Sequence, residues 1–409
     1  NSDCAATDLT CNPILSLGLA FLLLPAEAAA TTTTTQNLTG VYVLGFRDFG
    51  GLRGHIKRFS RFGTEDSRWA LDVTVGTTDR LLNDAVVGTD GALYVGGQQQ
   101  DGAGQQWMLR RYVDGQETTA GGAKLEAPVS EVFAMASDGA GHIFAAGRTA
   151  TTDAYLQKYT EAGELLWSAQ ASVGTSVRFA DVALASDGSV FVVGTALLGG
   201  NPQWIVKKYD SNGNEITAGW DKLLTPAGSG THSANSVALD SAGNVYVAGT
   251  QRLTTDADLW IRKFAPDGTE DTTNWNKVFD SGGAGDLGQA VAIGPDDSVY
   301  LAGDHSSGAS VDFWLKKFSP EGVEDTSNWN LVLDNDNDED LTEDMRVAPD
   351  GDVYVTGSAT IAGTVDWWML RLSADGVQDT GGWNRAFEGG SGSDESSTSI
   401  VLELENVEQ

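Results

Sequence analysis

The chain has 409 residues, a formal charge of −32 and a pI near 4.2. A surface this acidic repels nucleic acid and anionic lipid headgroups, which excludes both as main partners. The two cysteines, Cys4 and Cys11, are too few for a disulfide framework, and no group of histidines stands near them to complete a zinc site. One local disulfide between Cys4 and Cys11 would fit an oxidising compartment.

Residues 1–36 differ from the rest of the chain. An apolar run at 14–24 ends at Pro25, and threonines fill 31–35. Eleven apolar residues are too few for a membrane-spanning helix, which needs about 20. The run fits a retained signal-like segment, a short packed helix, or a stretch that follows a lipid-modified cysteine. We expect it to dock on a partner or neighbouring subunit, because an exposed apolar run is unfavourable in water. Membrane attachment, if any, would be through an N-terminal anchor.

From residue 37 onwards the sequence repeats, and residues 235–275 give the clearest copy. This stretch alternates apolar and polar residues in four short segments, which predicts strand, turn, strand, loop, strand, turn, strand. A glycine three residues after an aromatic marks each copy. These glycines are Gly45, Gly97, Gly147, Gly194, Gly249, Gly303 and Gly357. A spacing near 50 residues with four strands predicts an all-β fold, a seven-bladed β-propeller over 37–409.

The first repeat lacks its first strand, because threonines and residues 37–40 stand where it should be. The chain ends in an alternating stretch, 399–405, that no further blade follows. We therefore expect 399–405 to complete blade 1 and close the ring, since closure removes two open sheet edges.

Two stretches of the repeat resemble a known family. Ser236–Thr250 reads Ser-Val-Ala-Leu-Asp-Ser-Ala-Gly-Asn-Val-Tyr-Val-Ala-Gly-Thr, and Asp258-x-Trp-Ile-x-Lys-Phe follows it. Together they resemble the bacterial SBBP-type β-propeller repeat, over about 38–405. The resemblance implies a secreted or surface-attached, lipoprotein-like bacterial protein without assigned activity.

A basic residue recurs near the end of each predicted third strand. The seven residues at this position are Arg58, Arg111, Lys158, Lys208, Lys263, Lys317 and Arg371. Each shares a strand face with apolar residues, so we expect these side chains to be partly buried and to need partners. Aspartates recur in the first turn and at the start of the third strand, which suggests ion pairs that fix strand register. A positive ring for an anionic ligand is the alternative interpretation.

The densest acidic stretch contains Asp334, Asp336, Asp338 and Asp340, between blades 6 and 7. Alternating Asp and Asn oxygens can surround Ca²⁺, although the spacing departs from the EF-hand pattern. A solvated acidic turn is the other interpretation. Apart from Ca²⁺, no cofactor is expected.

No residue set indicates a reaction, since the four histidines fall at different repeat positions. We therefore hypothesise a non-catalytic extracellular or cell-surface propeller that acts as a scaffold or protein-interaction subunit. The alternatives are a hydrolase, lyase or oxidoreductase with its site at the channel mouth, and a carbohydrate-binding lectin that presents exposed tryptophans.

Overall fold

The computed structural model describes residues 34–48, 52–73, 80–101, 104–118, 124–126, 129–149, 152–225, 230, 232–252, 256–282, 285–335, 338–361, 363–387 and 395–408. The apolar run at 14–24 and both cysteines lie outside these residues. Asn37–Glu405 forms one compact unit, and Asn1–Gln36 with Asn406–Gln409 forms another. The first unit contains the propeller. Over the described ranges no helix is long and apolar enough to cross a membrane.

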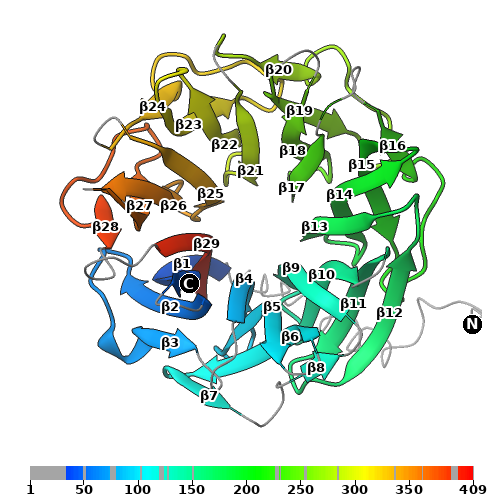
Figure 1. Cartoon of the computed structure of the whole chain (residues 1–409), viewed down its shortest axis with the longest axis horizontal. Coiled ribbons are helices and arrows are strands. Elements are labelled where there is room, and N and C mark those ends of the chain that lie inside the picture. Colours follow the sequence, from blue (N-terminus) through cyan, green and yellow to red (C-terminus); the bar gives the residue numbers. More distant parts are fainter. Residues whose placement is uncertain are drawn as a thin grey trace, which may run out of the picture. The chain divides into compact units, whose positions relative to one another are not determined.

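Seven antiparallel sheets surround a common axis, so the predicted seven-bladed β-propeller is confirmed (Figure 1). Blade 1 contains β29 (Glu395–Glu408), β1 (Thr34–Asp48), β2 (Leu52–Ser60) and β3 (Leu71–Val73), with a 3₁₀ turn at Ser67–Trp69. Blade 2 contains β4 (Arg80–Val87), β5 (Leu93–Asp101), β6 (Gly104–Val113), β7 (Gln116–Thr118) and β8 (Lys124–Glu126). Blade 3 contains β9 (Val129–Ser137), β10 (His142–Thr149), β11 (Ala154–Thr160) and β12 (Leu165–Ala171).

The remaining four blades follow the same order from the axis outwards. Blade 4 contains β13 (Val177–Leu184), β14 (Val190–Leu198), β15 (Asn201–Tyr209) and β16 (Lys222–Leu224). Blade 5 contains β17 (Ser233–Leu239), β18 (Val245–Gln251), β19 (Asp258–Phe264) and β20 (Lys277–Phe279). Blade 6 contains β21 (Leu287–Ile293), β22 (Val299–Ser306), β23 (Val311–Phe318) and β24 (Leu331–Leu333). Blade 7 contains β25 (Asp340–Val347), β26 (Val353–Ile361), β27 (Thr364–Leu372) and β28 (Arg385–Phe387).

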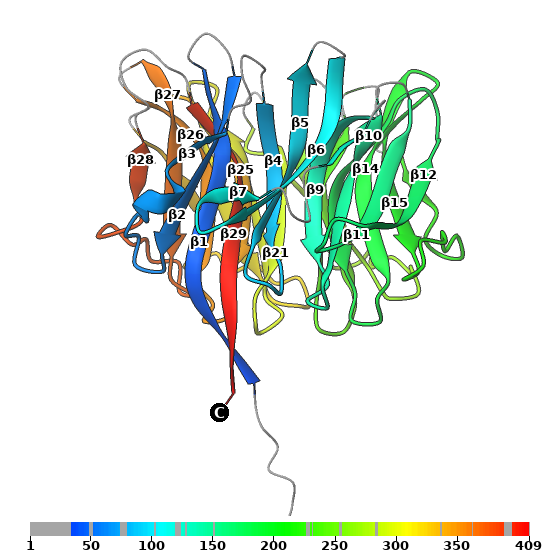
Figure 2. The same ribbon diagram turned by 90° about the horizontal axis from the view of Figure 1, so that it is seen from below.

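The C-terminal strand closes the ring, as the sequence predicts. Strand β29, red in Figure 2, lies beside the blue β1 as the inner strand of blade 1. It also joins both neighbouring blades. Ser397 donates a hydrogen bond to the carbonyl of Gly357 in blade 7 at 2.7 Å, and Thr398 donates one to the carbonyl of Leu82 in blade 2 at 2.6 Å.

The marker glycines are required because of a bulge in the neighbouring inner strand. In blade 5 the pairing of β17 with β18 shifts register between Ala234 and Ser236. A Cβ on Gly249 would lie 2.0 Å from the carbonyl oxygen of Ser233, which no side chain tolerates.

Tryptophans at the outer part of the blades join each blade to the next. Their indole Nε1 atoms donate to a hairpin carbonyl of the following blade at 2.9–3.1 Å. The donors are Trp167, Trp220, Trp275, Trp329 and Trp383, and the last of these connects blade 7 to Arg61 of blade 1. Burial of these large rings between blades supplies much of the core.

Candidate functional site

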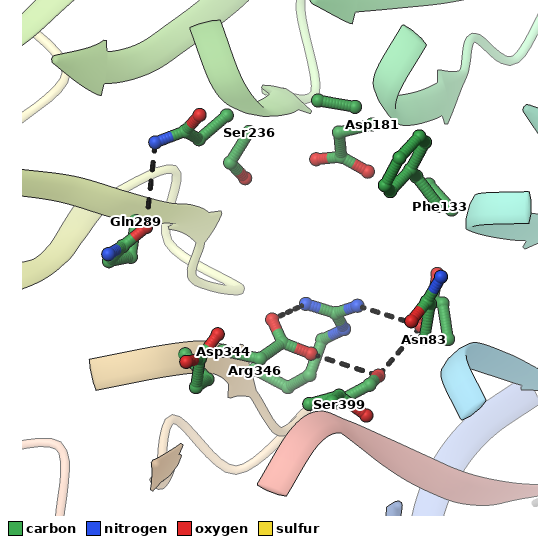
Figure 3. A pocket seen from close by; sticks show the side chains of 14 residues that line it. Asn83, Phe133, Asp181, Ser236, Gln289, Asp344, Arg346 and Ser399 are labelled. Atoms are coloured by element: carbon green, nitrogen blue, oxygen red, sulfur yellow. Dashed lines mark hydrogen bonds and ion pairs between the residues drawn. The ribbon is translucent and has the colours of Figure 1, made fainter. Parts of the chain in front are cut away.

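The inner strands meet at a polar cavity on the propeller axis. Strands β4, β9, β13, β17, β21 and β25 each carry a register shift, and the bulged residue faces the axis. With Thr398 of β29 the bulged residues form a ring of seven: Asn83, Phe133, Ala180, Asn235, Gln289, Glu343 and Thr398. The cavity they line has a volume of about 100 Å³, and Figure 3 shows its side chains. A second cavity of about 290 Å³ shares Asp181, Ser236 and Arg346 with it.

Three residues of this ring bind the next blade. Asn83 donates to the carbonyl of Val132 at 2.7 Å, and Asn235 donates to that of Gly288 at 2.7 Å. Thr398 makes the equivalent bond to Leu82. Each accepting carbonyl precedes or adjoins the bulge of the following blade, so these bonds connect neighbouring inner strands.

In three blades the residue after the bulge is an aspartate, and its carboxylate accepts a hydrogen bond from the next blade. Asp84 accepts hydrogen bonds from its neighbour Ala85 and from the amide of Met135 in the next blade, at 2.8 and 2.7 Å. Asp181 accepts from Val237 of the next blade at 2.7 Å. Asp344 accepts from Ile400 at 3.0 Å, which carries the pattern into the C-terminal strand.

Ser399 and Arg346 join two of these carboxylates. The Ser399 hydroxyl lies 2.7 Å from Asp84 Oδ1 and 3.1 Å from Asp344 Oδ2. The Arg346 guanidinium hydrogen-bonds Asp344 and lies 3.9 Å from Asp84 Oδ1 (Figure 3). One cation therefore offsets part of the negative charge of this cavity.

Burial dominates the protonation of the axial carboxyls. It raises the pKa of Asp84 to about 6 and that of Asp181 to about 7. Burial within the cavity, with the charges of Asp304 and Asp344, raises the pKa of Glu343 to about 8. Glu343 faces the cavity, and no hydrogen bond joins it to the described residues. It is therefore the axial carboxyl available to an incoming molecule.

The predicted basic residues lie on the third strands, away from the axis. Six of them place their cation 4.9–5.9 Å from the ring centroid of the marker aromatic on the second strand: Arg58, Arg111, Lys158, Lys208, Lys263 and Lys317. Arg371 pairs instead with Asp352, and with Asp379 at 3.1 Å. First-turn aspartates reach three of the others: Asp90 at 2.6 Å, Asp138 at 3.7 Å and Asp240 at 3.9 Å.

A second basic position, one residue earlier, was not predicted. Lys57, Lys207 and Lys316 are 4–8 % exposed, and each pairs with the glutamate eight residues later, at 2.5–2.7 Å. Arg262 makes the same pair with Glu270. The regular spacing of a basic residue and a glutamate was the sequence signal that could have revealed these pairs.

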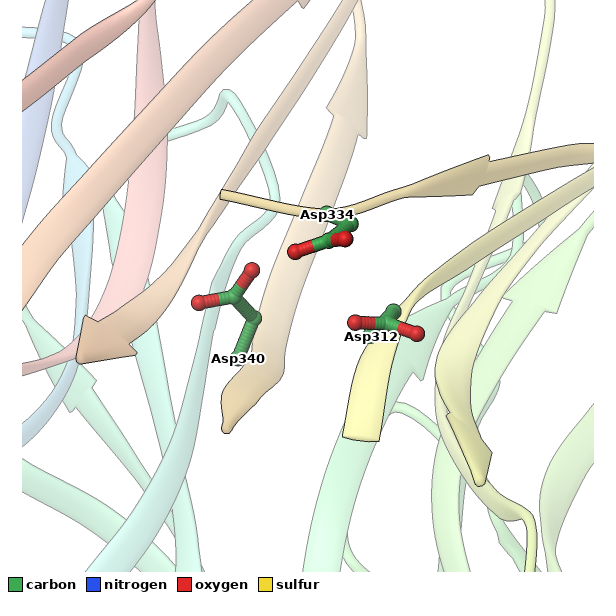
Figure 4. Close-up of side chains that lie close together, drawn as sticks. All are labelled: Asp312, Asp334 and Asp340. Atoms are coloured by element: carbon green, nitrogen blue, oxygen red, sulfur yellow. The ribbon is translucent and has the colours of Figure 1, made fainter. Parts of the chain in front are cut away.

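The predicted acidic stretch is only partly brought together. One oxygen each from Asp312, Asp334 and Asp340 lies within 4.8 Å of the others (Figure 4). Asp338 is exposed and outside this group, and Asp336 lies outside the described residues. Asp312 comes from the third strand of blade 6 and was not among the predicted ligands.

Exposed tryptophans, which a lectin would need, are not found. Eleven of the twelve are buried, and Trp167 is partly buried. The histidines do not converge either. Burial lowers the pKa of His55 to about 4, and its Nδ1 lies 2.8 Å from Asp72, whereas His142 pairs with Asp138 in another blade.

Comparisons with known proteins agree with the propeller. A family model described as a domain of unknown function (DUF5122), a β-propeller, matches residues 348–381. No curated protein matches the chain. The periplasmic gluconolactonase of Pseudomonas aeruginosa is similar in structure, with a TM-score of 0.58 and 12% identity, over 90% of this chain and 99% of that one. A hypothetical selenium-binding protein from Sulfolobus tokodaii gives a TM-score of 0.55 and 12% identity, over 89% and 93%. At such identities the likeness concerns the fold.

Proposed function

We propose that this propeller is a non-catalytic protein-interaction subunit whose partner binds the hairpin tips of blades 6, 7 and 1. The observation that carries the proposal is the exposure of three apolar side chains. Phe62 is 66 %, Val323 68 % and Val377 67 % exposed, more than any other large apolar residue in the described part of the chain. Isolated exposed apolar residues are ordinary, but a group on adjacent blades is typical of an interaction surface.

The three tips follow one another along the rim. Each lies in the hairpin between the third and fourth strands of its blade. The blade 1 hairpin accepts the Trp383 hydrogen bond from blade 7, and the blade 7 hairpin accepts that of Trp329 from blade 6. The same hairpins of blades 2 to 5 expose polar residues: Asp114, Gln116, Glu164, Asn212, Asn214 and Asp267. Blade 3 exposes Leu165 and Leu166 at 40 % and 44 %, but both belong to its fourth strand. The most exposed apolar tips thus lie on three consecutive blades.

The charge of the chain indicates the character of the partner. With a net charge of −32, the propeller attracts a surface that carries basic residues around an apolar centre. Steering by charge and burial of the three tips would then act together.

The test replaces the three tips by threonine in the full chain, as F62T/V323T/V377T. A matched control, L223T/V278T, changes two apolar residues of the outer strands that are 43 % and 42 % exposed. We expect the triple variant to melt like the wild type, because exposed substitutions change stability by at most about 0.5 kcal/mol.

The partner is isolated by crosslinking in source cells, purified, and titrated into each variant by calorimetry. We expect one stoichiometric protein whose Kd rises at least about tenfold for the triple variant, a loss of about 1.4 kcal/mol, and stays unchanged for the control. Equal Kd values for all three proteins would show that the tips are not the interface.

Docking through residues 1–36 is a separate part of the proposal. The apolar run at 14–24 supports it. Deleting 1–36 and measuring the mass of the assembly by light scattering tests it, and an unchanged mass would refute it. The same run and the SBBP resemblance support an extracellular or cell-surface location, which fractionation of cells producing the full chain tests.

One observation favours an enzyme as the second candidate. Glu343 and Asp181 line one cavity with pKa values of about 8 and about 7, in the range suited to general acid–base catalysis. The gluconolactonase with the same fold suggests a lactone as the first substrate to try. Hydrolysis of D-glucono-1,5-lactone by the wild type, lost in E343Q, would favour this candidate over a non-catalytic role.

A further inference from the structure

Two successive blade junctions carry the same acidic corner. One aspartate lies at or near the start of the third strand, the second follows the fourth strand, and the third lies at or just before the next inner strand. Between blades 5 and 6 these residues are Asp258, Asp280 and Asp286. Between blades 6 and 7, 54 residues later, they are Asp312, Asp334 and Asp340. The repeat therefore provides an internal comparison.

At the junction of blades 5 and 6 the inner carboxylate is satisfied by the protein. Asp286 Oδ1 accepts hydrogen bonds from the Ser281 hydroxyl at 2.8 Å and from the amide of Ser306 at 2.9 Å. Its Oδ2 accepts one from the amide of Ser281 at 2.5 Å. At the junction of blades 7 and 1 the inner carboxylate is paired with a cation, because Arg47 lies 2.7 Å from the buried Glu395.

At the junction of blades 6 and 7 the protein satisfies the inner carboxylate less completely, although the backbone amides of Asn335 and Thr360 still oppose the rise that burial causes in the pKa of Asp340. Asparagine replaces the serine, and Asn335 donates only its amide, to Asp340 Oδ2 at 2.7 Å.

Asp340 is fully buried and Asp312 is 5 % exposed, yet Oδ1 of each has no hydrogen-bond partner. No Lys or Arg of the described ranges forms an ion pair with either residue. Each carboxylate thus has one partnered oxygen, since Asp312 Oδ2 accepts from the Ser310 hydroxyl at 3.2 Å, and one buried oxygen without a partner. His305 stands opposite Asp312 on the neighbouring strand and is the basic group that acts on it. A buried carboxylate oxygen without a partner is unfavourable, so the corner favours a further positive group.

The arrangement of the three carboxylates indicates which cation would fit this corner. Figure 4 shows the three carboxylates turned towards a common space, and their nearest oxygens lie within 4.8 Å of one another. Ca²⁺ accepts carboxylate oxygens in a flexible geometry, whereas Mg²⁺ demands a near-ideal octahedron and keeps several of its waters. Asp334 is exposed, which leaves room for water ligands. We infer that Asp312, Asp334 and Asp340 bind Ca²⁺ between blades 6 and 7.

The three ligands come from two blades, whereas a calcium-binding loop draws its ligands from one short segment. Asp312 belongs to blade 6 and Asp340 to the inner strand of blade 7, so a bound ion connects two blades. Burial and the neighbouring carboxylates raise the pKa of Asp340 to about 7, which agrees with a corner whose charge is uncompensated until the ion binds.

The test uses the full chain after treatment with EDTA. CaCl₂ is titrated by calorimetry, and thermal melts are recorded with and without millimolar CaCl₂ or MgCl₂. The variants are D312N, D340N and the matched control D258N, which alters the equivalent residue of blade 5. We expect wild type and D258N to bind one Ca²⁺ at this site and to melt at higher temperature with it. When free Ca²⁺ is 100-fold above Kd, the unfolding equilibrium constant should fall about 100-fold.

D312N and D340N should raise the Kd at least about tenfold while melting no lower than the wild type in EDTA, because each removes an uncompensated charge. That second measurement separates loss of the site from loss of the fold. No heat and no shift for the wild type, or an equal response of D312N and D258N, would overturn the site. An equal effect of MgCl₂ would overturn its assignment to Ca²⁺.

Discussion

The axial cavity and the acidic corner between blades 6 and 7 both contain buried aspartates, but these differ in how their oxygens are hydrogen-bonded. On the axis, Asp84, Asp181 and Asp344 are buried or half-buried, and each accepts an amide of the next blade. At the corner, Asp312 and Asp340 are just as buried, yet each keeps an oxygen without a partner. The axial carboxylates therefore connect neighbouring blades, and those of the corner are the ones that we propose bind Ca²⁺.

The comparison shows how to look for function in a repeated fold. A polar group whose partners recur from blade to blade is part of the scaffold. The corner stands out because the repeat keeps its three aspartates but loses the serine that satisfies them one blade earlier. Variants of the ring closure, the axial network and the basic positions test the scaffold side of this comparison, and the calcium titration tests the other.

The largest expected effect is that of deleting residues 396–409. The deletion removes most of the inner strand of blade 1, with Ser399 and the hydrogen bonds of Ser397 and Thr398 to both neighbouring blades. The cost should be comparable to the whole free energy of folding, about 5–15 kcal/mol. We expect no cooperative melting transition by circular dichroism. A chain lacking only 406–409, which belong to the other compact unit, should melt like the wild type. Cooperative melting of the longer deletion would show that β29 does not close the ring.

Ser399→Ala tests whether the axial bonds stabilise the fold. The hydroxyl is 2 % exposed and bridges Asp84 and Asp344, so its loss leaves two carboxylates with one partner fewer. We expect a loss of about 1–3 kcal/mol, measured by urea denaturation. Ser396→Ala is the control, because that hydroxyl bonds only the carbonyl of the adjacent Ser397. If both variants unfolded at the same urea concentration, the axial network would contribute nothing.

The architecture could be predicted because its signals lie close together in sequence. Each marker glycine and its aromatic are three residues apart, and the alternating stretch at 399–405 has no other blade to complete. The prediction of ring closure is confirmed, although the strand is longer, Glu395–Glu408. The bulges were not predictable, because a register shift depends on the partner strand.

The corner was predicted only in part for a similar reason. Asp334 and Asp340 stand out as a dense acidic stretch, but Asp312 lies 22 residues before Asp334 and meets it only when the third and fourth strands pair. Sequence spacing favoured Asp336 and Asp338 instead. The single axial Arg346 had no repeated counterpart to draw attention to it.

A smaller effect is expected at the basic residues of the third strands. Lys208→Met keeps the apolar stem but removes the cation that lies 5.0 Å from the Phe191 ring and 5.8 Å from that of Trp220. We expect a loss of about 0.5–1 kcal/mol by urea denaturation. Arg371→Met should cost more, because it also leaves Asp352 and Asp379 without their partner. The reverse order would mean that the aromatic contact, and not the ion pairs, makes this position basic.

The smallest effect concerns Glu343 and appears only as a dependence on pH. Its pKa is raised from the usual 4.5 to about 8, so the folded protein keeps a proton that the unfolded chain has released. The free energy of unfolding therefore falls as the pH rises from 4.5 to about 8. Glu343→Gln removes this titration without changing the shape of the side chain. The inner strands surround Glu343, which raises its pKa, but its side chain still contacts the solvent of the cavity. The solvent screens its charge, so the difference should stay below about 1 kcal/mol.

The melting temperatures of the wild type and E343Q should accordingly be equal below pH 4.5 and diverge up to pH 8, with E343Q the more stable above it. Asp181 and Asp340 also have raised pKa values, but they are common to both proteins and cancel in the comparison. A constant difference at all pH values would mean that Glu343 is ionised throughout. The axial cavity would then contain a negative charge that no cation of the scaffold neutralises. In this respect it would be like the corner between blades 6 and 7.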